Sequence, residues 1–262
     1  MNIVLIGAGK WGKNYISTLS NFSNVNLQIA NRDNWKKLID DKPDGVIIST
    51  PPQSHIEIAC HSLSLGIPIM IEKPLSLSLS EALVLKQFKA PILVNHIHLF
   101  SVAYQNLRDF THSHKIDKIV SFGVNNSPDR DYSSLWDYGC HDIAMILDLA
   151  QEFPHKIKAE QIETERGALF KIKLKFKTFE TESYVGNSAE KSVRKIKVSS
   201  DGLNIKYNDN KRPSNQAPPL TMALFTFIKA IEGNKDYRLG LDLSLKVLQV
   251  LESCEKSLTS YN

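Results

Sequence analysis

Three glycines close to the start of the chain constrain its fold more than any other feature. Gly7, Gly9 and Gly12 directly follow residues 3–6, an unbroken apolar run typical of a strand buried on both faces. Apolar residues with helical spacing begin at Tyr15. In such a unit the first glycine permits the tight turn, the second lets the backbone approach a pyrophosphate, and the third lets the helix pack against the strand. The helix N-terminus would face the phosphate charge. The turn therefore predicts a parallel α/β sheet that binds a dinucleotide.

The same stretch allows two other interpretations. Gly7 and Gly12, followed by Lys13, approximate the phosphate loop of nucleoside triphosphatases, but Asn14 stands where that loop needs Ser or Thr to hold magnesium. The glycines could also serve the turn alone. The single residue between Gly7 and Gly9 favours the dinucleotide turn.

Short apolar runs and helical patterns alternate through the rest of the first half. Further strands are predicted at residues 25–30, 45–50, 67–71 and 91–95, and helices at residues 56–65 and 80–88. Strand–helix repetition at this spacing predicts a parallel sheet with helices on its faces, the Rossmann-type doubly wound arrangement.

The pattern changes near Ile97. Helices are predicted at residues 101–111, 136–150, 221–232 and 241–258, with a polar loop at residues 208–219. Lysines alternate with apolar residues at 171–177, which predicts an antiparallel strand with one wet face. This lysine row could bind a partner, although such rows more often discourage edge aggregation. We expect a dinucleotide-binding domain at residues 1–97. A substrate-binding α+β domain with an open, mostly antiparallel sheet would follow at residues 98–262, with C-terminal helices that could pack back on the first domain.

Composition and charge exclude several classes of protein. The 262 residues carry 32 Lys and Arg against 28 Asp and Glu, and a net charge of +4 spread along the chain does not predict nucleic-acid binding. No apolar run approaches the roughly 18–20 residues of a membrane span, and the early start of the first strand leaves no room for a secretion signal. Three widely spaced cysteines predict no disulfide framework, and the histidines and cysteines lack zinc-site spacing. We expect a cytoplasmic protein with no metal, nucleic-acid or membrane partner.

Three further motifs follow the glycine turn in order. They are S-T-P-P-Q-S-H at residues 49–55, E-K-P at residues 72–74 and W-D-Y-G-C-H-D at residues 136–142. With the glycine turn they make the chain resemble the Gfo/Idh/MocA oxidoreductases, whose hallmarks are a T-P-P turn, an E-K-P strand end and a D-x-G-x-H helix. The segment 225–257 resembles the C-terminal helices of that family, so the resemblance covers most of the chain. The chain would be a short member, with fewer residues than usual at 31–44 and in the second domain.

The positions of the motif residues themselves suggest an active site. Lys73 lies at the carboxyl end of a predicted strand, where open α/β sheets bind their ligands. Asp137 and His141 are four residues apart on one predicted helix, so they share a face, and a carboxylate near an imidazole raises its proton affinity and orients its ring. Hydride removal from an alcohol also needs a base for the hydroxyl proton, a task that suits His. Taken alone such a pair is more often an ordinary exposed helix pair. The other motifs favour the active site.

The family resemblance implies a role for each site residue. Lys73 would contact the reacting hydroxyl and the nicotinamide, Asp137 would assist, and His141 would transfer the proton. The pyrophosphate would lie on Gly7, Gly9 and Gly12. The remaining cofactor-binding positions would be Lys10, Trp11, Asn31, Arg32, Thr50, Pro51, His55, Glu72 and Lys73. The substrate pocket would include His98 and Tyr138.

The end of the second predicted strand bears on the choice of cofactor. A carboxylate there would accept bonds from the ribose 2′-OH of NAD, whereas an arginine would accommodate the 2′-phosphate of NADP. Asn31 followed by Arg32 favours NADP, while Asp33 keeps NAD open.

The resemblance implies NAD(P)-dependent hydride transfer to or from a CH–OH group of a sugar, polyol or nucleotide-linked sugar. One alternative is an imine or other C=N or C=C reductase on the same fold, which needs a proton donor but no base directed at a hydroxyl. Another is a non-catalytic NAD(P)-binding sensor or partner subunit. The resemblance also implies a homo-oligomer, either a dimer or a tetramer.

Overall fold

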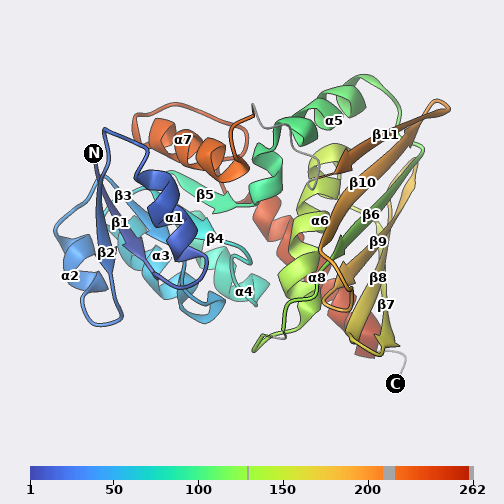
Figure 1. The fold of residues 1–262 in the computed structure, drawn as a ribbon, viewed down its shortest axis with the longest axis horizontal. Helices are drawn as coiled ribbons and strands as arrows, with labels where there is room; N and C mark the ends of the chain where they lie inside the picture. The colour runs from blue at the N-terminus through green and yellow to red at the C-terminus, as the bar shows by residue number, and fades with distance from the viewer. Residues whose placement is uncertain (129, 209–215, 260–262) are drawn as a thin grey trace. The chain divides into compact units, whose positions relative to one another are not determined.

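The computed structural model describes residues 1–128, 130–208 and 216–259 (Figure 1). The chain divides into two compact units, of which the first consists of residues 1–97 and 217–245 and the second of the rest of the described chain. Residues 217–245, which follow the second sheet in the sequence, therefore group with the first unit. Most of the predicted loop at 208–219, namely residues 209–215, lies outside the described residues.

A five-stranded parallel sheet forms the first unit, in the order β2-β1-β3-β4-β5. Its strands are β1 (Asn2–Ile6), β2 (Asn26–Ala30), β3 (Gly45–Ile48), β4 (Ile69–Glu72) and β5 (Ile92–Asn95). The last three strands are buried along their whole length, as expected of apolar runs covered on both faces. Ile6 lies in register with Ala30 on one side and with Ile48 on the other. The order thus reverses at β1, the point where open sheets bind ligands.

The helices of this unit differ from the predicted ones in two places. They are α1 (Gly12–Leu19), α2 (Trp35–Asp40), α3 (His55–Ser64), α4 (Leu79–Ala82) and α7 (Pro219–Ile231), with 3₁₀ turns η1 (Pro52–Ser54) and η2 (Leu83–Gln87). The sequence pattern does not predict α2. The helix predicted at residues 80–88 is a single α turn followed by η2. Its two fully buried residues, Ala82 and Leu85, are three apart, which matches the period of a 3₁₀ helix.

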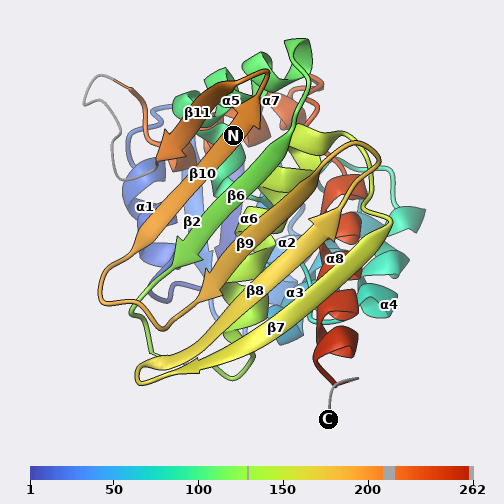
Figure 2. The ribbon, with the colours of Figure 1, turned by 90° about the vertical axis from the view of Figure 1, so that its right-hand side faces the viewer.

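The second unit is built on a six-stranded sheet in the order β11-β10-β6-β9-β8-β7 (Figure 2). The strands are β6 (Lys118–Val124), β7 (Lys156–Thr164), β8 (Gly167–Lys175), β9 (Glu180–Gly186), β10 (Val193–Ser200) and β11 (Leu203–Asn208). Within the described strands β6 and β9 pair in parallel, and every other pair is antiparallel. The predicted fold class, a Rossmann-type sheet followed by a mostly antiparallel one, is confirmed.

Helices cover one face of the second sheet. The segment between the two sheets includes η3 (Ile97–Phe100) and α5 (Val102–Ser113), which contacts β11, while α6 (Ser134–Ala150) packs on β6 and β9. The last helix, α8 (Asp242–Thr259), begins in the first unit and continues into the second. No helix in the described part of the chain is long and apolar enough to cross a membrane.

A buried ion pair ties α6 to the sheet. Asp142 is fully buried and pairs with Arg194 of β10, which is itself nearly buried. A Cβ atom at Gly123 of β6 would collide with both side chains. The absence of a side chain at Gly123 therefore leaves room for the Asp142–Arg194 ion pair against the sheet.

The other face of the second sheet, which we call the lysine face, points toward the viewer in Figure 2, with α6 behind the sheet. The predicted alternation in β8 is confirmed, because Lys173 and Lys175 are exposed while Ile172 and Leu174 are buried. The strand ends at Lys175, so Lys177 lies outside it. Strand register gathers nine lysines and three glutamates on this face: Lys118, Lys156, Lys158, Lys171, Lys173, Lys175, Lys195, Lys197, Lys206, Glu160, Glu180 and Glu182.

Candidate functional site

The glycine turn occupies the carboxyl end of β1. Gly7 has a φ of +97°, and a Cβ there would lie 2.6 Å from the Ser49 carbonyl oxygen, so only glycine fits against the end of β3. A Cβ at Gly12 would collide with the carbonyl of Gly7, which is why α1 can pack close to β1. A Cβ at Gly9 would meet nothing within 4 Å. Open space therefore faces the backbone at Gly9, as the close approach of a phosphate requires.

A buried carboxylate holds this turn in place. Glu72, the last residue of β4, is 8% exposed, and its Oε1 accepts hydrogen bonds from the Trp11 indole, from the Tyr15 hydroxyl at 2.6 Å and from Asn95 Nδ2 at 2.7 Å. Its Oε2 accepts from the backbone N–H of Lys73 at 3.2 Å. Burial raises the pKa of the Glu72 carboxyl, and burial together with the Glu72 charge raises the pKa of Tyr15 well above its ordinary value. One side chain thus connects the glycine turn, α1, β4 and β5.

The carboxyl ends of β4 and β5 also carry Lys73, Asn95 and His96. Lys73 is half-buried. His96 is 5% exposed, and its Nε2 lies 3.0 Å from the Ser244 hydroxyl. Burial and the charge of Lys73 lower the pKa of His96 to about 4, so its ring is neutral at neutral pH. Asn95 Oδ1 and His96 Nδ1 are buried and have no hydrogen-bond partner among the described residues.

His55 braces the turn that follows β3. Its ring is completely buried, with Nε2 at 2.9 Å from the Thr50 carbonyl oxygen and Nδ1 at 3.0 Å from that of Pro74. Burial lowers the pKa of this imidazole. The Ser54 hydroxyl donates to Thr50 Oγ1 at 2.8 Å, and Pro51 is exposed beside it. His55 therefore joins two backbone segments, one at the end of β3 and one after β4.

Asn31 and Arg32 lie just beyond β2 and are exposed, as are Lys10 and Trp11 of the glycine turn. Asn31 Oδ1 accepts from the backbone N–H groups of Asp33 at 2.9 Å and Asn34 at 3.0 Å. Asn34 Oδ1 accepts in return from the backbone N–H of Asn31 at 2.8 Å. This reciprocal turn leads into α2 and engages the Asn31 side-chain oxygen within the chain.

The second unit carries the other predicted catalytic side chains on α6. Asp137 is 3% exposed and pairs with Arg130 Nε at 2.6 Å. His141 is half-buried, and its ring centroid lies 4.8 Å from that of His98, with the planes at 78°. Tyr138 is buried on the same helix. Asp137, Tyr138, His141 and His98 thus belong to one unit, whereas the glycine turn, Glu72 and Lys73 belong to the other.

Several residues of the two clusters are not predicted from the sequence. In the first unit they are Tyr15, Asn95 and His96, and in the second Arg130 and Tyr207. Asn95 could have been found from the sequence, because it is a polar residue at the carboxyl end of an apolar strand, where open sheets bind ligands. Tyr15, His96 and Tyr207 are recognisable only from partners distant in the sequence, and Arg130 only from its place beside Asp137.

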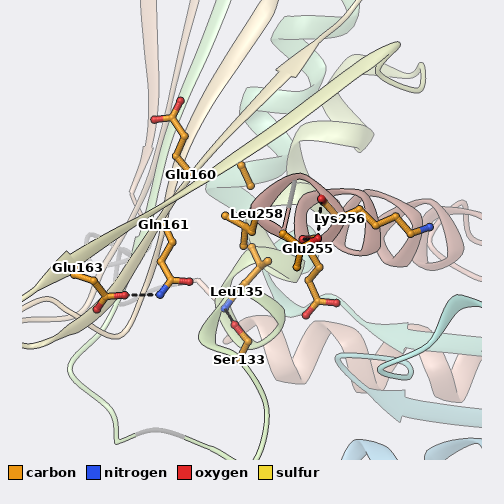
Figure 3. Close-up of a pocket in the computed structure, with 10 residues that line it drawn as sticks. Ser133, Leu135, Glu160, Gln161, Glu163, Glu255, Lys256 and Leu258 are labelled. Carbon is orange, nitrogen blue, oxygen red and sulfur yellow. Dashed lines mark hydrogen bonds between the residues drawn. The ribbon is translucent and has the colours of Figure 1, made fainter. Parts of the chain in front are cut away.

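Figure 3 shows a cavity of about 860 Å³ in the second unit that contains none of the predicted site residues. Its lining includes Glu160, Glu163 and Glu255 against the single lysine Lys256. An acidic lining of this kind disfavours the phosphates of a dinucleotide. Among the described residues, no group of three His, Cys, Asp or Glu side chains could hold a metal ion.

The chain is similar to a known family of oxidoreductases and to solved structures of dehydrogenases. A family model described as the oxidoreductase family, NAD-binding Rossmann fold (GFO_IDH_MocA), matches residues 22–90. No curated protein matches the chain. A solved structure from Magnetospirillum magnetotacticum MS-1, of a protein named as an oxidoreductase, has 28% sequence identity, covers 97% of this chain and 99% of its own, and gives a TM-score of 0.85.

Two more distant structures share the fold. The UDP-N-acetylglucosamine 3-dehydrogenase of Acidithiobacillus ferrooxidans is 15% identical, with 100% of this chain and 98% of that chain covered and a TM-score of 0.84. The myo-inositol 2-dehydrogenase of Lactobacillus plantarum is 16% identical, with the same coverages and a TM-score of 0.85.

The carboxyl edge of the first sheet fits a dinucleotide. The open space at Gly9 would accept a phosphate against the backbone, and the turn is held rigidly by Glu72. Asn95 Oδ1 and His96 Nδ1 offer buried polar atoms that lack a partner within the described chain. The family match and this geometry agree on an NAD-binding Rossmann domain.

Proposed function

We propose that this chain is an NAD(P)-dependent dehydrogenase acting on a CH–OH group of a sugar, polyol or nucleotide-linked sugar, because its residues 22–90 match the model of the GFO_IDH_MocA oxidoreductase family with its NAD-binding Rossmann fold. The observation that carries the proposal is the carboxyl edge of the first sheet, where an open glycine turn stands beside Lys73 and is anchored by Glu72. Relatives of the same fold that are named for UDP-N-acetylglucosamine and myo-inositol support this substrate class.

The cofactor would be held by the first unit. Gly7, Gly9 and Gly12 would hold the pyrophosphate, with Lys10, Trp11, Thr50 and Pro51 lining the cofactor and the buried His55 and Glu72 supporting these turns. Bound NAD(P) supplies the nicotinamide carbon that accepts or donates the hydride. Arg32 supports a preference for NADP, because it is exposed at the end of β2 and no carboxylate precedes it there.

Proton transfer would be the work of Lys73 and His141. In the oxidation, Lys73 would donate a hydrogen bond to the substrate oxygen, and His141 would take the hydroxyl proton while the hydride passes from the substrate carbon to the cofactor. In the reduction, His141 returns that proton. Asp137 assists, with its carboxylate held by Arg130. His98 and Tyr138 would border the substrate.

The test begins with the nucleotide that purified protein releases on denaturation. A panel of polyols, sugars and sugar nucleotides is then followed by nicotinamide absorbance. We expect Lys73→Met and His141→Ala to lower kcat at least about 100-fold, the usual scale of a lost general base. The matched controls are exposed residues elsewhere, Lys173→Met and His112→Ala, which should keep full activity.

Other outcomes would redirect or refute the proposal. Full turnover in both active-site variants would refute the mechanism. Turnover only with a C=N or C=C substrate, retained in His141→Ala, would indicate a reductase of that class. Tight NAD(P)H binding without oxidation of any panel member would indicate a cofactor-binding sensor or partner subunit.

We also propose a cytoplasmic homo-oligomer, a dimer or tetramer, which the family resemblance supports. The lysine face carries nine lysines against three glutamates, so two copies of it would repel each other across a Debye length of about 8 Å at physiological salt. We therefore expect association through another surface. Sedimentation velocity tests this, because an oligomer that dissociates at low salt and forms at high salt would indicate that the lysine faces meet.

A further inference from the structure

The second unit contains a buried aromatic network beside His141 that the proposed mechanism does not use. His98 comes from η3 and His141 from α6, and their rings meet edge to face at 4.8 Å and 78°. A half-buried imidazole in such a contact cannot rotate without displacing its neighbour. The contact with His98 therefore limits the orientations open to the His141 ring.

Tyr207 of β11 holds His98. His98 Nδ1 lies 3.1 Å from the Tyr207 hydroxyl, and the two ring centroids are 6.3 Å apart. Tyr207 has no exposed surface. A buried tyrosine directs its hydroxyl at a partner, and the bond to one imidazole nitrogen selects which nitrogen of His98 carries the proton.

Tyr207 in turn rests on an anchored tyrosine. The ring of Tyr104 from α5 lies 6.0 Å from that of Tyr207, with the planes at 83°, and Tyr104 is also fully buried. Its hydroxyl donates to Asp148 Oδ2 at 2.7 Å, and Asp148 pairs with Arg108 at 3.0 Å. The contacts that lead from His141 to this ion pair thus run through residues of η3, β11 and α5 that all belong to the second unit.

The charged groups on α6 are arranged in pairs. Three carboxylates of this helix each pair with an arginine: Asp137 with Arg130, Asp142 with Arg194 and Asp148 with Arg108. The pairing balances the charge that the helix brings to the neighbourhood of His141. Neutral contacts such as the one with His98 are then well suited to set the plane of the imidazole.

We infer that His98 and Tyr207 are positioning residues for His141: Tyr207 fixes the ring of His98, and His98 fixes the ring of His141 for proton transfer. The inference rests on the proposed function. It changes the role of His98 from a group that borders the substrate to one that acts through His141. A proton transfer that needs its donor and acceptor aligned loses rate when the donor ring is free to turn.

Tyr207→Phe removes one oxygen and keeps the buried ring. We expect kcat to fall about 10-fold, while KM and the dinucleotide Kd stay within about twofold, because a misoriented base slows the chemical step without weakening binding. His98→Phe, which keeps a ring against His141 but has no nitrogen to bond Tyr207, should lower kcat by a similar factor. Tyr184→Phe is the matched control, since its hydroxyl contacts Glu182 on the lysine face instead.

A second readout does not depend on turnover. Ring signals of ¹³C-labelled histidine are assigned by their loss in His141→Ala and His98→Ala. Tyr207→Phe should shift the signals of both rings, and Tyr184→Phe should shift neither. Unchanged kcat together with unshifted His141 signals in Tyr207→Phe would overturn the inference. Full activity in His141→Ala would instead overturn the proposed role of His141, while the ring signals would still decide whether Tyr207 and His98 orient it.

Discussion

The hydroxyl of Tyr15 allows the anchoring of the glycine turn to be tested by removing a single oxygen. Tyr15→Phe deletes a donor 2.6 Å from Glu72 Oε1 and keeps the fully buried ring. A hydrogen bond to a charged acceptor contributes about 1.5–3 kcal/mol. Asn95 Nδ2, which also donates to the Tyr15 oxygen, keeps Glu72 as its acceptor at 2.7 Å, so no buried donor is left without a partner. We therefore expect the free energy of unfolding to fall by about 2 kcal/mol.

Denaturant unfolding followed by tryptophan fluorescence measures this loss. The control is Tyr237→Phe in the same unit, whose side chain is 49% exposed and which should change the free energy of unfolding by less than about 0.5 kcal/mol. A Tyr15→Phe protein as stable as the control would refute the reasoning, because the buried carboxylate would then not depend on its donors.

The same carboxylate predicts a pH dependence with a definite sign. Burial, the largest cause, raises the pKa of Glu72 above its ordinary value of 4.5, so the folded protein disfavours the ionised form. The contribution of this group to stability is therefore complete below pH 4.5 and is lost as the pH rises through the raised pKa. Glu72→Gln removes that dependence. Its unfolding free energy relative to wild type should increase from acidic to neutral pH, and a constant difference would contradict the assigned pKa direction.

Three further perturbations follow from the structure. Gly9→Ala should leave stability unchanged, since its Cβ meets nothing within 4 Å, yet weaken dinucleotide binding about 10-fold or more by calorimetry; Gly7→Ala should lower both stability and binding. Asp142→Asn should lower the unfolding free energy by about 3 kcal/mol because the buried Arg194 loses its ion pair with Asp142, and adding Arg194→Met should recover part of the loss. Lys156→Glu, on the edge strand β7, would face Lys175 across the β7–β8 pair and should stabilise the protein by about 0.5 kcal/mol at low salt, an effect that salt should erase.

Local patterns account for the elements that could be predicted. The buried strands are continuous apolar runs, and the glycine turn has fixed spacing, so both are visible within ten residues of sequence. The helix α2 has only six residues, and its start depends on a reciprocal side-chain turn between Asn31 and Asn34. Such a turn has no hydrophobic period by which it could be recognised.

The distribution of charge also differs between the linear sequence and the folded protein. Along the sequence the excess of four positive charges is dispersed, and only the lysine row at residues 171–177 predicts a charged face. Strand register then places alternate residues of six strands on one side, which concentrates nine lysines on a single face. The alternation is a property of each strand, but the alignment of the strands is a property of the sheet.

The sequence by itself determined the parallel and antiparallel sheets, the glycine turn and the motif residues Lys73, Asp137 and His141, because each depends on neighbours within a few positions. Only the tertiary structure decided what holds those residues. Glu72 meets Tyr15 from 57 positions away, and His98 meets Tyr207 from 109 positions away. These partners are brought together by chain packing around a buried polar atom, which must find a hydrogen bond wherever the fold supplies one.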